Sequence, residues 1–236
     1  MASGRWRIAS GLLVVPAVVG GLAGCSGGGG QSAAVSATAS TTASNGSFSA
    51  AKLQKALLTQ VNGVAAAAPA TGGKYSSVAQ ASASKQASGV QVSPKACSQA
   101  ATEGFDPSAL SGAPAAGVTF QVGTNGVSEL LISSTAKSAS TALAGQVPAG
   151  CTKYSETVDG KTLTYSLAEE AVSGIGAQAK VLNVHPVSGT ADDLWSLIYR
   201  GTGFVGTVTV IGPNASEAAV KELGQQAYAF AVKSLA

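Results

Sequence analysis

The chain has 236 residues, of which 11% are charged and 5% are aromatic, and its formal net charge is +3. Basic and acidic residues are interspersed, which argues against nucleic acid as a partner and against a polybasic membrane patch. With so few charges and aromatic rings, we expect a core of Ala, Val, Leu and Ile under a surface of Ser, Thr, Gln and Gly.

The first 25 residues have the pattern of a secretory signal. Arg5 and Arg7 precede the apolar run 11–19, and Leu22-Ala23-Gly24-Cys25 follows. This last tetrapeptide resembles the lipobox of bacterial lipoproteins. In that family the cysteine thiol takes a diacylglyceryl group, the chain is cut before the cysteine, and the new N-terminus is usually acylated.

The resemblance implies that residues 1–24 are a lipoprotein signal peptide and that Cys25 is the lipidation site. A retained transmembrane helix needs about 20 apolar residues, whereas this run is shorter and contains Pro16. Cleavage without lipid would leave Cys25 as a free thiol in an oxidising compartment. We therefore expect lipid anchoring on the extracytoplasmic side of the cell membrane, and removal of the leader lowers the net charge to +1.

Residues 25–48 are predicted to be the lipid anchor and a disordered linker. The stretch 26–48 is rich in Ser, Gly, Ala and Thr and contains no charged residue. Such a segment cannot offset its ordering entropy by burying side chains. As a flexible coil it would span roughly 25–30 Å.

Residues 49–236 have the size of one domain. Leu53, Ala56 and Leu57 recur at helical spacing after a capping Ser49. Residues 62–73 are predicted to be a loop, and residues 74–92 are compatible with one or two strands. Ser93-Pro94 then predicts a short helix that contains Cys97.

Strand patterns dominate after residue 117. Hairpins are predicted around Thr124-Asn125-Gly126 and Asp159-Gly160, with a helix over 136–146 between them. The expected strands are 117–122, 127–132, 151–158, 161–167, 180–187, 194–199 and 205–211. A final helix is expected over 216–235, with Asn214 as its cap and Glu217 three positions later.

This order predicts an α+β fold. We expect an antiparallel sheet of about five to seven strands, packed against helices on one face, after the disordered N-terminal tether. Strands such as 162–167 alternate between polar and apolar residues, as in a sheet with one solvated face.

Two cysteines remain when Cys25 is assigned to lipid. Cys97 and Cys151 then have one pairing, and an oxidising compartment favours a disulfide between them. Two buried reduced thiols are the alternative. Since the chain has no Cys-x-x-Cys, a redox-active pair is not expected.

Catalytic, metal and cofactor sites are not expected. His185 is the single histidine and lies before Pro186 at a strand end, and the chain has no Gly-x-Ser-x-Gly elbow. His and Cys residues are too few for a zinc site.

Two further patterns have structural interpretations. The sequence 201–206 matches Gly-x-Gly-x-x-Gly, but a strand follows it rather than a helix, so a turn is favoured over a phosphate loop. Glu169-Glu170 and Asp192-Asp193 are interpreted as solvated loop ends.

Scarce aromatic residues gather near one turn. Trp195, Tyr199 and Phe204 are candidate ligand-binding residues for an apolar or glycan ligand. Core packing is the alternative, because alternate residues of one strand share a face.

The segment from residue 51 to the C-terminus resembles the sensor-type domains of actinobacterial lipoproteins. Related domains form the extracellular part of mycobacterial serine/threonine receptor kinases. The likeness rests on the opening helix 51–58, Cys97, Cys151, the strand pair 197–201 and 205–210, and the Ala-rich last helix. Those kinase domains carry two disulfides, whereas this chain supports one.

The resemblance and the lipobox together imply a non-catalytic binding or sensing domain. Its partners would be the membrane, through the lipid, and an unknown envelope ligand or protein, with no nucleic acid. A structural or chaperone-like envelope lipoprotein that contacts other proteins is the alternative. A secreted hydrolase is the third.

Overall fold

The structure is a computed structural model that describes residues 46, 48–83, 91–97, 106, 108–158, 160–187 and 191–236. The signal peptide, Cys25 and nearly all of the linker therefore lie outside the described residues. No helix in these ranges is long and apolar enough to cross a membrane.

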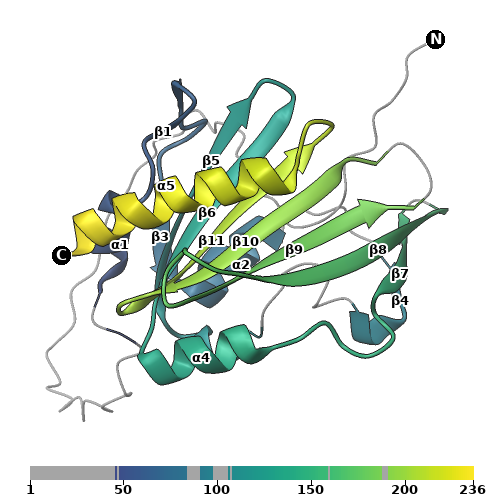
Figure 1. Ribbon diagram of the computed structural model, residues 1–236, viewed down its shortest axis with the longest axis horizontal. Helices are drawn as coiled ribbons and strands as arrows, with labels where there is room; N and C mark the ends of the chain where they lie inside the picture. The colour runs from purple at the N-terminus through teal and green to yellow at the C-terminus, as the bar shows by residue number, and fades with distance from the viewer. Residues whose placement is uncertain are drawn as a thin grey trace, which may run out of the picture.

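The domain is built on one antiparallel sheet of nine strands in the order β3-β5-β6-β11-β10-β9-β8-β7-β4 (Figure 1). Hairpins join several sequence neighbours, as the turn sequences predicted. The strands are β3 (Thr71–Lys74), β4 (Gln91–Ser93), β5 (Pro114–Val122), β6 (Asn125–Ser133), β7 (Lys153–Val158), β8 (Lys161–Val172), β9 (Gln178–Pro186), β10 (Asp193–Gly201) and β11 (Phe204–Gly212).

The α+β class and the antiparallel sheet are confirmed, but the expected five to seven strands are too few. Short strands occupy both edges of the sheet. β3 overlaps the end of the predicted loop 62–73 and contains Gly72 and Gly73, which give no alternating side-chain pattern. A separate two-stranded sheet, β1 (Gln60–Val61) with β2 (Val64–Ala65), also lies near that segment.

One predicted strand region is a helix. α2 (Tyr75–Ala83) occupies a part of 74–92 where strands were expected. Tyr75 and Val78 are both buried, and a spacing of three places them on one helix face. β4 does confirm a strand around Val92, and Cys97 lies in a short 3₁₀-helix, η1 (Lys95–Cys97).

Helices cover both faces of the sheet, so the prediction of one covered face is wrong. α1 (Ala50–Lys55) and α5 (Glu217–Leu235) pack on one face, over Val118, Leu197 and Val208. α2 and α4 (Ala136–Ala144) pack on the other face, over Ile132, Ile198 and Val205. Figure 1 shows α5 crossing in front of the sheet and α2 behind it.

Side-chain caps fix the N-terminal ends of α1 and α5. Ser49 caps α1 as predicted, accepting from the Lys52 amide. α5 is capped by Ser216 rather than by Asn214. The Asn214 amide instead donates to the Asn125 side chain, so Asn214 docks the hairpin between β5 and β6.

The disulfide between Cys97 and Cys151 is confirmed. It joins η1 to the segment before β7. Both cysteines are buried in a third apolar cluster with the stacked rings of Tyr154 and Tyr165. The bridge therefore ties the chain before Cys97 to the β7–β8 end of the sheet.

Candidate functional site

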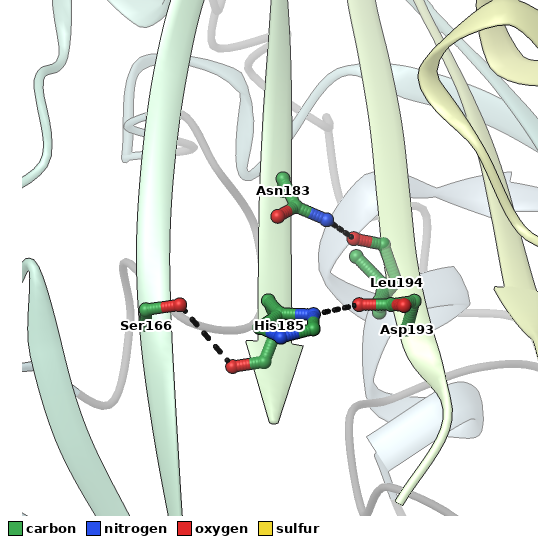
Figure 2. A network of polar contacts seen from close by, with 5 residues as sticks. All are labelled: Ser166, Asn183, His185, Asp193 and Leu194. Carbon is green, nitrogen blue, oxygen red and sulfur yellow. Dashed lines mark hydrogen bonds and ion pairs between the residues drawn. The ribbon is translucent and has the colours of Figure 1, made fainter. Parts of the chain in front are cut away.

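A row of polar side chains crosses three neighbouring strands near one end of the sheet. Ser166 on β8 lies opposite His185 on β9, and Asp193 begins β10 beside them. The His185 Nδ1–H donates to Asp193 Oδ1 over 2.6 Å (Figure 2). The His185 side chain is 55% exposed and that of Asp193 is 34% exposed, so solvent and ligands reach the pair.

Two further hydrogen bonds hold this row to the backbone. Asn183 Nδ2 donates to the Leu194 carbonyl over 3.2 Å. The Ser166 hydroxyl donates to the His185 carbonyl over 3.4 Å rather than to the imidazole (Figure 2). Activation of Ser166 as a nucleophile would require its hydroxyl to turn toward the ring. As placed, the row supports hydrogen bonding to a ligand more directly than it supports acyl transfer.

The row continues as a ladder of hydroxyl groups on β7 and β8. Ser155 pairs with Thr164 over 3.3 Å, and Thr157 pairs with Thr162 over 2.9 Å. We call this surface the polar face. It comprises Ser155, Thr157, Thr162, Thr164, Ser166, Asn183, His185 and Asp193, all exposed or half-buried.

The polar face lies on the same side of the sheet as α5. α5 contacts β9, β10 and β11. Figure 1 shows β8 beside it with no described helix in front. The polar face is therefore open because the covering helix packs on β9, β10 and β11.

The predicted ligand-binding aromatic residues do not line one surface. Tyr199 and Phe204 are 0% and 1% exposed, and they pack edge to face in the core beside Tyr228. Trp195 is half-buried and lies opposite Asn183, where the core meets the polar face. The two buried rings match the core-packing alternative, and a ligand role for the three residues stays a prediction.

Gly206 makes room for the ring of Tyr199. The two residues are paired across β11 and β10, and a Cβ at Gly206 would overlap the ring carbons and hydroxyl oxygen of Tyr199. Because Tyr199 is fully enclosed, its ring has little freedom to move away. We expect Gly206→Ala to lower the free energy of unfolding by about 2 kcal/mol, measured by urea denaturation.

Gly73→Ala is the matched control for that substitution. A Cβ at Gly73 would meet only Val78, at an ordinary 3.9 Å. We expect a change of under about 0.5 kcal/mol there. Equal effects of the two substitutions would contradict the packing of Tyr199 against Gly206.

The other sequence motifs have structural positions. The sequence 201–206 spans the turn from β10 to β11, so the turn interpretation is confirmed: Gly201 ends β10, Gly203 lies in the turn at φ 80°, and Gly206 lies in β11. Glu169 and Glu170 lie inside β8, so their prediction as loop ends is wrong. Glu169 pairs with the buried Lys180 over 3.3 Å. Among the described residues, no group of three or more His, Cys, Asp or Glu is placed to hold a metal.

Two buried acids were missed in the sequence. Glu129 is 1% exposed and Glu156 is 3% exposed. Burial raises the pKa of Glu129 to about 8, although its hydrogen bond from the Leu58 amide opposes this. Burial also raises the pKa of Glu156. The signal was present for Glu129, because it alternates with the core residues Val127 and Leu131.

No protein-family model matches the chain. No curated protein matches it either. Among solved structures, the extracellular domain of PknH from Mycobacterium tuberculosis is similar with a TM-score of 0.42 and 16% identity, over 64% of this chain and 79% of that chain. A putative uncharacterized protein (Rv0999 ortholog) from Mycobacterium smegmatis has a TM-score of 0.36 and 13% identity, over 72% and 85%.

The first of these neighbours is a domain of the kind that the sequence resemblance indicated. At TM-scores below 0.5, the two likenesses lead to no conclusion about activity, ligand or partner.

Proposed function

We propose that this chain is a lipid-anchored, extracytoplasmic binding or sensing domain without catalytic activity. The observation that carries the proposal is the division of the three cysteines. Cys97 and Cys151 form a buried disulfide, which fits an oxidising compartment, and Cys25 is left at the lipobox. The anchor would use one cysteine and the exported fold uses the other two, so each of the three cysteines has a role.

The polar face is the surface we assign to the ligand. Phe48 donates its amide to Ser133 at the end of β6, so the linker meets the sheet there. β11 runs between the two regions: its first residue pairs with Ser133 and its last with Asp193. The polar face thus reaches the end of the sheet farthest from the linker, where an envelope ligand or protein has access.

A thermal-shift screen tests ligand binding. We expect an envelope extract or glycan fraction to raise the melting temperature of the full chain. Asn183→Ala should abolish the shift, since Asn183 lies in the polar face opposite Trp195. The control is Lys233→Ala, which changes an exposed residue of α5 and should retain the shift. No shift with any fraction would count against the proposal. Crosslinking in cells that recovers only proteins would favour the structural lipoprotein instead.

Cys25→Ala tests the anchor. We expect the native protein in the membrane fraction with an intact mass that includes acyl groups. Each buried methylene contributes about 0.8 kcal/mol to membrane binding, so the Ala variant should leave the membrane fraction. Native protein without any fatty modification would refute lipid anchoring while leaving a binding domain intact.

A hydrolase is the third candidate, favoured only by the row Ser166, His185 and Asp193. If it is correct, the chain should cleave an activated ester, and both Ser166→Ala and His185→Ala should reduce the rate by at least about 100-fold. Activity that survives in His185→Ala would eliminate this candidate, because His185 is the chain's single histidine.

A further inference from the structure

Glu129 is a carboxyl group placed inside an apolar core. On β6 it lies between Val118 of β5 and Val208 of β11, and it is 1% exposed. Its Oε2 accepts from the Leu58 amide over 2.7 Å, just beyond the end of α1. Its Oε1 is buried and has no hydrogen-bond partner. One carboxyl oxygen therefore holds the end of α1 and the other is unsatisfied.

Tyr199 brings a second unsatisfied group toward Glu129. Its hydroxyl is buried without a partner. Its ring lies over Gly206 of β11, where a side chain would collide with the hydroxyl end. Gly206 is paired on its other side with Leu131 of β6, two residues from Glu129 on the same face. The ring thus extends from β10 across β11 toward the strand that carries Glu129.

The groups around Glu129 do not neutralise a negative charge. β5 and β11 place valines beside it, β10 contributes Tyr199, and Tyr228 of α5 packs on Tyr199 with ring centroids 5.6 Å apart. On α1, the Lys52 ammonium donates to the Leu235 carbonyl and Lys55 is exposed. Glu129 forms no ion pair with any described residue.

We propose that Glu129 and the Leu58 amide form a proton-dependent clasp that holds α1 on the sheet. With its carboxyl protonated, Glu129 accepts from Leu58 and brings no charge into the apolar core. Loss of the proton leaves a charge in the core with one amide to stabilise it. Release of α1 lets water reach the carboxylate.

The clasp acts on the first element after the predicted linker. α1 follows Phe48 and Ser49 directly. Leu53 of α1 packs in the core against the sheet, as do Ala56 and Leu57 just after the helix. Release of α1 would therefore free the segment that directly follows Phe48, whose amide donates to Ser133 on the sheet.

The direction of the pH dependence follows from burial. The pKa of Glu129 is about 8 in the docked state and near the ordinary 4.5 once hydrated. A raised docked pKa means that docking is strongest below pH 4.5. It weakens by up to tenfold per pH unit between 4.5 and about 8, and it levels off above that.

Hydrogen exchange of the full chain tests the clasp. Native protein and Glu129→Gln are compared at each pH from 5 to 9, so that the intrinsic exchange rates cancel. For amides of residues 50–58 we expect the native-to-variant ratio of exchange rates to rise about tenfold per pH unit up to about pH 8. Glu170→Gln, an exposed acid on β8, should behave like the native protein.

A ratio that stays constant with pH would overturn the clasp. So would exchange of residues 50–58 that is no faster than that of the central strands at high pH, since that would show global unfolding rather than release of α1. If Glu129→Gln fails to fold, ¹³C NMR of the native chain decides. The carboxyl assigned to Glu129 should titrate near pH 8, and its titration below pH 6 would overturn the proposal.

Discussion

Replacing Glu129 with Gln is expected to remove most of the loss of global stability that the native protein shows from pH 4 to pH 9. The pKa of this carboxyl is about 8 in the fold, against 4.5 ordinarily, because burial disfavours the charge. The stabilising effect of its proton is complete below pH 4.5 and is lost as the pH rises through 8. The full difference is on the order of 5 kcal/mol.

Urea denaturation at pH 4, 7 and 9 measures this effect as the difference between variant and native protein. Burial also raises the pKa of Glu156, but Glu156 is present in both chains. The difference between the two chains therefore reports the effect of Glu129 on stability. Glu170→Gln is the control and should leave the native pH dependence unchanged, since Glu170 is exposed. A native protein as stable at pH 9 as at pH 4 would show that the Glu129 carboxylate is compensated in the fold.

Strand alternation explains why so much of the sheet was predictable. In β7 and β8 one face is solvated, so Tyr154 and Tyr165 alternate with Ser155 and Thr164, and the pattern identifies the hairpin. β3 gave no such pattern, because its central residues are Gly72 and Gly73. Its place in the sheet comes from pairing with β5, which a local pattern does not encode.

A sheet that is covered on both faces has strands with consecutive apolar residues, and this chain contains such a run. The run Leu130-Leu131-Ile132 in β6 places apolar side chains on both sides of the sheet. Leu131 packs under α1 and α5, and Ile132 packs under α2 and α4. α2 itself escaped prediction because Tyr75 and Val78 alone do not distinguish a helix from a strand.

The polar face depends on register more than on composition. His185 and Asp193 are eight residues apart, and they meet because Leu194 pairs with Val184 across β10 and β9. A change of one residue in that register would send the two side chains to opposite faces. The sequence identified His185 as the single histidine, but only the pairing of the strands gives it Asp193 as a partner.

Removing the disulfide with Cys97→Ala and Cys151→Ala is expected to lower the free energy of unfolding by about 4 kcal/mol. The bridge closes a loop of 54 residues, and the chain-entropy cost of leaving that loop open sets this magnitude. The loss should be largest around β4, which pairs with β7 through only three residues, Gln91, Val92 and Ser93. Urea denaturation gives the global effect, and hydrogen exchange of residues 91–97 gives the local one.

Two controls distinguish loss of the covalent bridge from loss of side-chain packing. They are the single variant Cys151→Ala and a chemically reduced sample of the native protein. Both cysteines are buried beside Tyr154 and Tyr165, so alanine also removes sulfur contacts. Reduction breaks the bridge but keeps both sulfurs. Reduced native protein should therefore lose nearly as much stability as the double variant. If reduction leaves the unfolding curve and the exchange of residues 91–97 unchanged, packing rather than the covalent link holds η1 against the sheet.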